Sequence, residues 1–239
     1  MSSTSKALLL VYTEPGANVD EADFNHWYDN EHVPLRANIP EVFTGGISRI
    51  KSIDGSKPAF AAIYDVESAA ALQKPAYSNL TETRSERERD IFARIGVVDR
   101  RVYEAYAGPS IPPSPRFDEN KGGAYTIVVE KEVPGEAEDD FNKWYDEEHI
   151  PLLSRIPGWL RSRRFVLVEE SVFGTDTGPH KRTGRPAKYL AVHEWETSNA
   201  SGKSDTPEYK EAMDTEWMVK VNKTLIARTK REFELLRAW

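Results

Sequence analysis

The chain has 239 residues, of which 39% are hydrophobic and 30% charged, and its net charge is −7. This composition excludes a disordered chain, and the acidic balance argues against a protein that follows a nucleic-acid backbone. The absence of cysteine excludes disulfides, thiolate nucleophiles and Cys-ligated metal centres, and it fits the reducing cytoplasm, where we expect the protein to lie. The apolar run ALLLVY near the N-terminus is too short to span a membrane and has no cleavage-site pattern, so we expect neither a membrane anchor nor a leader.

The predicted elements come in the same order twice. The first half should contain a strand, a helix, two strands, a helix and a last strand, at 7–12, 23–35, 42–53, 58–68, 75–95 and 98–106. The second half repeats this series at 125–129, 140–152, 159–170, 186–197, 207–226 and 228–237. Apolar runs bounded by Pro and Gly indicate the strands, and a proline in the first turn marks the second helix of each half.

One stretch of the sequence occurs twice. Residues 23–42 and 140–159 are identical at 12 of 20 positions with a constant offset of 117, and DFNHWYDNEHVPL returns as DFNKWYDEEHIPL. We therefore expect two ferredoxin-like β-α-β-β-α-β repeats, 1–106 and 123–239, joined by a Pro-rich linker at 107–122. Each repeat would leave one sheet face bare, so the two sheets should pack on each other as a dimer within one chain. The expected architecture is an α+β barrel with its helices outside, and a further homodimer stays open.

The motif Trp-Tyr-Asp-x-Glu-His-x-Pro-Leu, inside a duplicated unit, resembles the dimeric α+β barrel superfamily and most of all its EthD-like branch. The resemblance covers both halves except the linker and a long hairpin in the second half. Relatives include cofactor-free lactone isomerases, polyketide cyclases, quinone-forming monooxygenases and some heme proteins. The resemblance implies a pocket between each sheet and its own helices, where histidine and tyrosine transfer protons. It implies catalytic roles for His32 and His149 and, more loosely, for Tyr77 and Tyr209, which stand where a plant-type cyclase has histidine.

Each motif helix carries its ring side chains on one face. Helical spacing relates Phe24, Trp27, Tyr28, His32 and Leu35, and likewise Phe141, Trp144, Tyr145, His149 and Leu152. Both histidines should therefore face the interior, where an imidazole suits proton transfer near neutral pH. Asp29 and Asp146 could accept a hydrogen bond from a ring nitrogen and set the tautomer. The candidate substrate contacts are Trp27, Tyr28, Tyr64, Asp29, Trp144, Tyr145 and Asp146.

The motif histidines also have a structural interpretation. Pro34 and Pro151 should end the helices, and a histidine in the last turn is favoured by the helix dipole. A metal site has little support, because Asp-x-x-His offers two ligands and no third is visible.

The third strand of each half carries a further candidate residue, whose side chain can face either of two directions. Tyr64 aligns with His193, and this strand face meets either the helices or the barrel interior. The first arrangement adds both side chains to the candidate sites, with His193 as a catalytic residue, and the second makes them core residues. Because both sheet faces are buried, alternation leaves the two arrangements open.

The leading hypothesis is a cofactor-independent enzyme that performs His/Tyr acid-base chemistry on an aromatic, polyketide-like or lactone small molecule. Isomerisation, cyclisation or dehydration would fit paired interior histidines beside tyrosine hydroxyls, and the chain lacks Rossmann and phosphate-loop glycine patterns. The alternative is a non-catalytic module of the same fold that binds a hydrophobic ligand or serves assembly. RNA binding shares the topology but conflicts with the acidic charge, and a heme-dependent protein is a fourth possibility.

Overall fold

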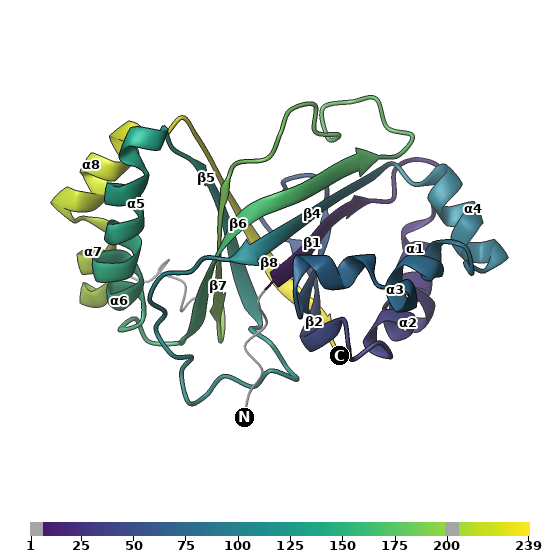
Figure 1. Ribbon diagram of the computed structural model, residues 1–239, viewed down its shortest axis with the longest axis horizontal. Coiled ribbons are helices and arrows are strands. Elements are labelled where there is room, and N and C mark those ends of the chain that lie inside the picture. Colours follow the sequence, from purple (N-terminus) through teal and green to yellow (C-terminus); the bar gives the residue numbers. More distant parts are fainter. Residues whose placement is uncertain (1–6, 199–205) are drawn as a thin grey trace.

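A computed structural model of the chain describes residues 7–198 and 206–239. The expectation that the chain begins without a leader concerns its first six residues, which lie outside these ranges. The described strands close into one antiparallel barrel in the order β1-β3-β2-β8-β5-β7-β6-β4 (Figure 1). The strands are β1 (Ala7–Glu14), β2 (Phe43–Ser52), β3 (Phe60–Val66), β4 (Val97–Ala105), β5 (Tyr125–Glu132), β6 (Trp159–Phe173), β7 (Tyr189–Trp195) and β8 (Ala227–Ala238).

The helices lie outside the barrel in two groups. Figure 1 shows α1 to α4 on one side of the strands and α5 to α8 on the opposite side. The first group comprises α1 (Glu21–Trp27), α2 (Val33–Ala37), α3 (Pro75–Ser78) and α4 (Glu86–Arg94). The second comprises α5 (Glu138–Trp144), α6 (Ile150–Leu153), α7 (Pro207–Met213) and α8 (Glu216–Thr224). Short 3₁₀ turns cover Ala69–Gln73, Asn79–Thr81 and Gly135–Ala137.

Two seams close the barrel between distant parts of the sequence. β2 pairs with β8, and β4 pairs with β6, for example Val98 with Phe173. Between the seams, the strands run in the orders β4-β1-β3-β2 and β8-β5-β7-β6. The structure is therefore a mixed α+β protein with a closed barrel, and every barrel strand has a neighbour on both sides, which protects sheet edges from aggregation.

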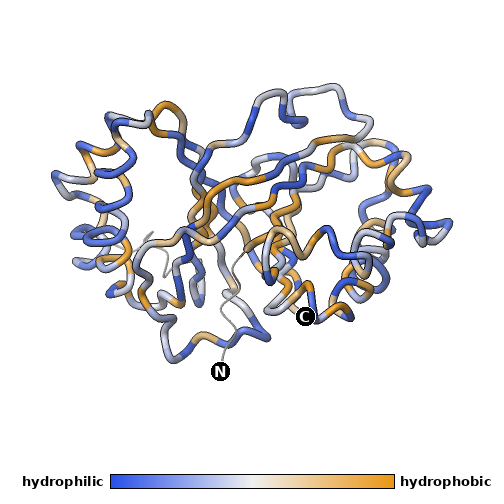
Figure 2. The backbone as a smooth tube through the Cα atoms, in the orientation of Figure 1, coloured by the Kyte–Doolittle hydropathy of each residue, from blue (hydrophilic) through white to orange (hydrophobic). Residues whose placement is uncertain are grey.

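Alternation along the strands divides the buried side chains into three cores. Leu8, Leu10, Val128, Leu190 and Val192 belong to the barrel interior, and the next residues along each strand face a helical layer. Figure 2 accordingly shows hydrophobic colour along the strands and alternating colour on the helices. Tyr64 packs in the outer core of the first group of helices, and the His193 ring lies 6.2 Å from that of His149. Of the two arrangements left open by the sequence, the structure has the one in which these strand faces meet the helices.

The expectation that proline ends each motif helix is wrong. Tyr28–His32 and Tyr145–His149 form single π-helical turns, and α2 and α6 continue through Pro34 and Pro151. In the first turn, the amide N–H of Val33 bonds the carbonyl of Tyr28, five residues earlier. Proline has no N–H and its ring crowds the carbonyl four residues earlier, so the wider turn accommodates it.

The π turn also changes the helix phase. An extra residue in the turn rotates the next helical segment, so Leu35, expected inside, is 44% exposed and Arg36 is 8% exposed. In the second half Leu153, at the position that corresponds to Arg36, is likewise buried.

The second helix of each half also differs from expectation. The helix expected at 75–95 is broken into α3, a 3₁₀ turn and α4, and the helix expected at 207–226 is broken into α7 and α8.

Candidate functional site

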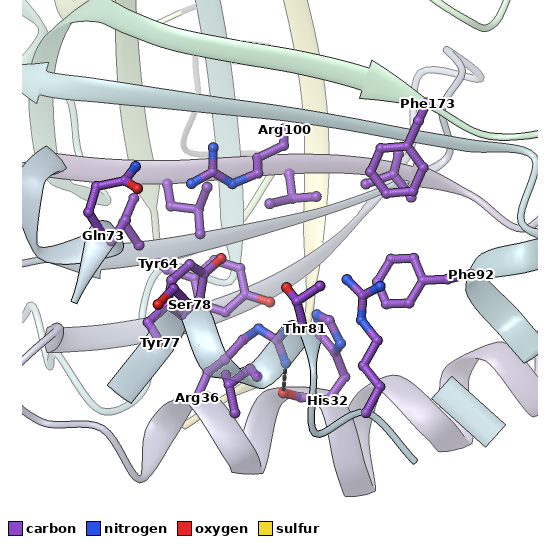
Figure 3. A pocket seen from close by; sticks show the side chains of 16 residues that line it. His32, Arg36, Tyr64, Gln73, Tyr77, Ser78, Thr81, Phe92, Arg100 and Phe173 are labelled. Carbon is purple, nitrogen blue, oxygen red and sulfur yellow. Dashed lines mark hydrogen bonds between the residues drawn. The ribbon is translucent and has the colours of Figure 1, made fainter. Parts of the chain in front are cut away.

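A cavity of about 270 Å³ lies between the first helical layer and the outer face of the sheet. The strands and the helical layer each supply both apolar and polar side chains to its wall, for example Phe173 and Arg100 from strands and Phe92 and His32 from the helical layer (Figure 3). His32, Tyr64 and Tyr77, three of the residues singled out in the sequence, line it together. The structure adds residues that the sequence analysis did not name, chiefly Arg36, Gln73, Ser78, Thr81, Arg84 and Arg100.

His32 is held by a buried carboxylate behind it. Its Nδ1 lies 2.8 Å from Oε1 of Glu88, and both side chains are buried. The ring also packs against Trp27 at 4.6 Å and Tyr28 at 4.8 Å between centroids. Nε2 has no hydrogen-bond partner within the described part of the chain, and the ring lines the cavity. A carboxylate on one ring nitrogen and a free second nitrogen is the arrangement that orients an imidazole for proton transfer.

The local sequence explains how Glu88 reaches this position. Ser85 caps α4, and its Oγ accepts from the backbone N–H of Glu88 at 2.9 Å. In a capping box, the glutamate three residues after the cap usually turns back to the cap N–H. Here the carboxylate of Glu88 instead contacts the imidazole of His32, which comes from a helix more than fifty residues earlier in the chain.

Burial and neighbouring cations keep His32 neutral. Burial of the ring, followed by the charges of Arg36, Arg84 and Arg49, holds the pKa of His32 well below its ordinary value. Burial raises the pKa of Glu88, and Arg36 and Arg84 oppose this rise. At neutral pH we therefore describe the pair as a neutral imidazole whose Nδ1–H donates to the Glu88 carboxylate, with a lone pair on Nε2.

Arg36 brings a buried cation to the same wall. It donates from Nη1 to the backbone carbonyl of His32 at 2.6 Å, and its Nη2 lies 3.9 Å from Glu88. Arg84 also lines the cavity and stacks over the Phe92 ring at 4.3 Å. Cations beside a neutral base favour a ligand that carries or develops negative charge.

Two phenols meet beside the histidine, Tyr28 from the π turn and Tyr64 from β3. The hydroxyls of Tyr28 and Tyr64 share a hydrogen bond of 3.1 Å. Burial raises the pKa of both groups, so each stays protonated near neutral pH. Tyr77, at the start of α3, packs edge-on against Phe43 and also lines the cavity.

The second half lacks the carboxylate partner. α8 begins after its cap Thr215 as α4 begins after Ser85, and this correspondence places Met218 where Glu88 stands. Nδ1 of His149 is buried without a partner in the described residues, and a hydrogen bond links the ring to the backbone of Ala212. The ring stacks on Trp144 at 4.3 Å. His149 is thus buried as expected but has a different environment from His32.

The other second-half candidates lie close to His149. Nδ1 of His193 is 2.8 Å from Oγ of Ser162, which also accepts from Nε1 of Trp159 at 2.9 Å. Burial, then the charges of Lys131, Lys230 and Arg164, lower the pKa of His193 to about 3. Tyr209 is partly buried against the same core. His149, His193 and Tyr209 line none of four cavities of about 270, 360, 320 and 600 Å³ among the described residues. Their catalytic role stays a prediction.

The aspartates of the motif do not orient the histidines. Asp29 accepts from Nη1 of Arg49 at 2.6 Å, and Asp146 accepts from Nη1 of Arg164 at 2.9 Å. Each arginine reaches from its strand, β2 or β6, to the π turn and stacks on a motif tyrosine, so these ion pairs connect helix and sheet. The rings proposed to contact substrate are largely core residues: Trp27, Tyr28, Trp144 and Tyr145 are each at most 2% exposed.

The sequence marks the helix position of Glu88 but not its contact with His32. The series Ser85-Glu-Arg-Glu88 is a capping-box pattern at the start of a helix, and an apolar residue, Ile91, follows one turn later. The sequence carries no such signal for Arg36, because the burial of its side chain depends on the π turn.

Across the described residues, no group of three His, Cys, Asp or Glu side chains is placed to hold a metal ion. Nor does any described helix have the length and apolar character needed to cross a membrane.

The closed barrel with two outer helical layers is the dimeric α+β barrel fold, and solved structures share it. An anthrone oxidase-like protein matches with a TM-score of 0.56 and 11% identity, over 100% of this chain and 95% of that one. A candidate monooxygenase from Lactobacillus acidophilus NCFM matches with a TM-score of 0.54 and 11% identity, over 98% of each chain. No protein-family model and no curated protein matches the sequence. At these identities the similarity shows the fold alone.

Proposed function

We propose that the cavity of the first half is the active site of an enzyme in which His32 is the general base. The observation that carries this proposal is the His32–Glu88 pair: a buried imidazole with a carboxylate on Nδ1 and a free Nε2 in a cavity wall. The proposed reaction needs no cofactor. Isomerisation, cyclisation and dehydration all begin with the same proton abstraction.

In the proposed first step, Nε2 of His32 takes a proton from an acidic C–H bond of the substrate. The electron pair left on carbon delocalises to a carbonyl oxygen, giving an enolate or phenolate. Arg36 supplies positive charge near that oxygen, and Tyr64 and Tyr77 offer hydroxyl donors. The imidazolium then returns the proton to another position of the substrate, which completes an isomerisation, or to a leaving hydroxyl, which completes a dehydration.

The proposed substrate class is an aromatic, polyketide-like or lactone compound. The rings of Phe92, Phe173 and Tyr64 line the cavity and suit a planar molecule, and the arginines suit its anion. One structurally similar protein is described as anthrone oxidase-like. Anthrones are aromatic ketones with an acidic C–H bond, which is the kind of proton that His32 would remove.

Exchange of that proton with deuterium tests the proposal without knowledge of the natural substrate. Anthrone incubated with the protein in D₂O should lose its acidic C–H signal in the NMR spectrum faster than in buffer alone. His32→Gln should reduce this acceleration at least a hundredfold, since it removes the base. His26→Gln, an exposed position on the same helix segment, is the matched control and should leave the rate unchanged.

Two other results would contradict the assignment of catalysis to His32. If His149→Gln removes the acceleration and His32→Gln does not, the reaction belongs to the second half. If wild-type protein binds 4-nitrophenol in the cavity but accelerates no exchange, the non-catalytic ligand-binding module of the same fold is favoured.

We also propose that the chain is a duplicated ferredoxin-like unit of the EthD-like branch, with repeats at 1–106 and 123–239 and a linker at 107–122. The identical strand order of the two runs, β4-β1-β3-β2 and β8-β5-β7-β6, supports the duplication. The absence of cysteine supports a cytoplasmic location.

A further inference from the structure

A second cavity, of about 320 Å³, lies at one end of the barrel beneath the hairpin that joins β6 to β7. This hairpin, residues 174–188, is much longer than its counterpart between β2 and β3, residues 53–59. Six basic residues line the cavity, against two acidic ones, in a protein whose net charge is −7. The basic residues are Lys57, Arg101, Arg182, Arg185, Arg228 and Arg231.

Two arginines at corresponding positions reach this end of the barrel. Arg101 on β4 lies opposite Leu10 of β1, and Arg231 on β8 lies opposite Val128 of β5. Arg101 has two carboxylate partners. Asp99 accepts a hydrogen bond from its Nη2 at 2.7 Å, and the Glu130 carboxylate lies 2.6 Å from its Nη1. Its buried charge therefore has carboxylate partners, as burial of an ion requires.

The corresponding partners of Arg231 are neutral. Thr229 stands two residues before it, as Asp99 stands two before Arg101, and Tyr12 occupies on β1 the place that Glu130 has on β5. The guanidinium of Arg231 lies over the Tyr12 ring at 4.6 Å and donates to Oγ of Ser56 at 2.9 Å and to the carbonyl of Pro58 at 2.5 Å.

Arg231 is 6% exposed, and within residues 7–198 and 206–239 no carboxylate forms an ion pair with it. A buried guanidinium without a counter-charge is unfavourable unless an anion joins it. The carbonyl and hydroxyl partners orient the group, and it faces a cavity large enough for a ligand. The unmatched charge thus points to a missing anion.

The hairpin adds further positive charge above this arginine. Arg182 is bound to Asp99 and Glu170, and Lys57 to Glu14. Arg185 is exposed and has no ion-pair partner in the described part of the chain. Arg185 is therefore available to a ligand that enters the cavity beneath the hairpin, and the Thr229 hydroxyl can donate from the β8 side.

We propose that this barrel-end cavity binds a phosphoryl anion, with Arg231 as its buried anchor and Arg185 as its outer contact. Nε and Nη2 of Arg231 already donate to Ser56 and Pro58, so its Nη1 is left to donate to a phosphate oxygen. Several cations around one cavity suit an anion with more than one charge. The phosphoryl group comes either as a free pyrophosphate or as part of a nucleotide. The site is separate from the His32 cavity, so neither proposal depends on the other.

Isothermal titration calorimetry of the full chain with pyrophosphate at low salt tests the proposal. Wild type should bind one equivalent, and affinity should fall as salt rises. Arg231→Gln should weaken binding at least tenfold, and Arg185→Ser several-fold. Arg116→Ser, which removes an exposed arginine that does not line the cavity, should bind like wild type.

Titration with ADP distinguishes the two sources of the phosphoryl group. Binding tighter than that of pyrophosphate indicates a nucleotide, and equal or weaker binding indicates the free anion. The proposal is overturned if neither compound binds at millimolar concentration, or if Arg185→Ser binds with wild-type affinity. The Arg185 variant carries the test if Arg231→Gln fails to fold, because Arg185 is exposed.

Discussion

Lys131 places an ammonium group inside the second outer core. The residue is 3% exposed, and its Nζ lies over the rings of Trp144 at 4.4 Å and Tyr145 at 5.0 Å. Burial, then the charges of Arg228 and Arg164, lower the pKa of Lys131 to about 7. The aromatic faces attract the cation but do not replace a carboxylate, and among the described residues no carboxylate pairs with it.

Replacement of Lys131 by methionine should change how stability depends on pH. The unfolded chain holds the lysine proton up to about pH 10, whereas the folded chain loses it near pH 7. The free energy of unfolding of wild type should therefore rise between about pH 7 and pH 10, by roughly 4 kcal/mol at most. Lys131→Met should lose this rise and be the more stable protein at pH 6. Urea unfolding at several pH values measures both effects.

The exposed Lys143→Met is the control for this change, and its pH dependence should match that of wild type. An equal rise between pH 7 and pH 10 in Lys131→Met would show that the lysine is not the group that titrates.

Single residues were predicted well where a repeated pattern marked them. Helical spacing placed His32 and His149 in the interior, and both are buried. The partner of each histidine could not be predicted in the same way, because Asp29 and Asp146 are near in sequence but point to Arg49 and Arg164. Glu88 is distant in sequence, and its contact with His32 depends on how α4 packs against the π turn.

The π turns are the elements that set the geometry of both halves. Each adds a residue between a helix that ends at a tryptophan and a shorter helix whose second residue is proline. The added residue brings Arg36 to the cavity and sends Leu35 to the surface. A regular helical wheel cannot predict this, because its phase is correct only as far as His32.

Deletion of Asn30 tests the role of the π turn. Without one residue, α1 and α2 would be rotated by about 100° relative to each other, so the buried positions of one of them would turn outward. We expect a loss of more than about 3 kcal/mol in the free energy of unfolding, since several buried contacts fail together. Asn30→Ala should cost less than about 1 kcal/mol, because the side chain is exposed. Equal effects of the two changes in urea unfolding would contradict this account.

At the scale of the whole molecule, the sequence predicted the fold class but not the difference between the halves. The duplicated motif and the alternating strands predict an α+β barrel with outer helices, and the closed barrel confirms that class. The two halves differ at single positions, such as Glu88 against Met218 and Arg36 against Leu153, and the aligned sequences do not reveal the structural consequence of these differences. Those differences give the first half a cavity with a carboxylate-bound histidine.

The imidazole tautomers of His32 and His149 test this difference most directly. Nitrogen-15 NMR of the protein at neutral pH reports in one spectrum which ring nitrogen of each histidine carries the proton. We predict that His32 is neutral with its proton on Nδ1, donated to Glu88, and that Glu88→Gln changes its signal. We predict that His149 carries its proton on Nε2, toward the backbone of Ala212. The account is contradicted if the proton of His32 is on Nε2, because that nitrogen could then not act as a base.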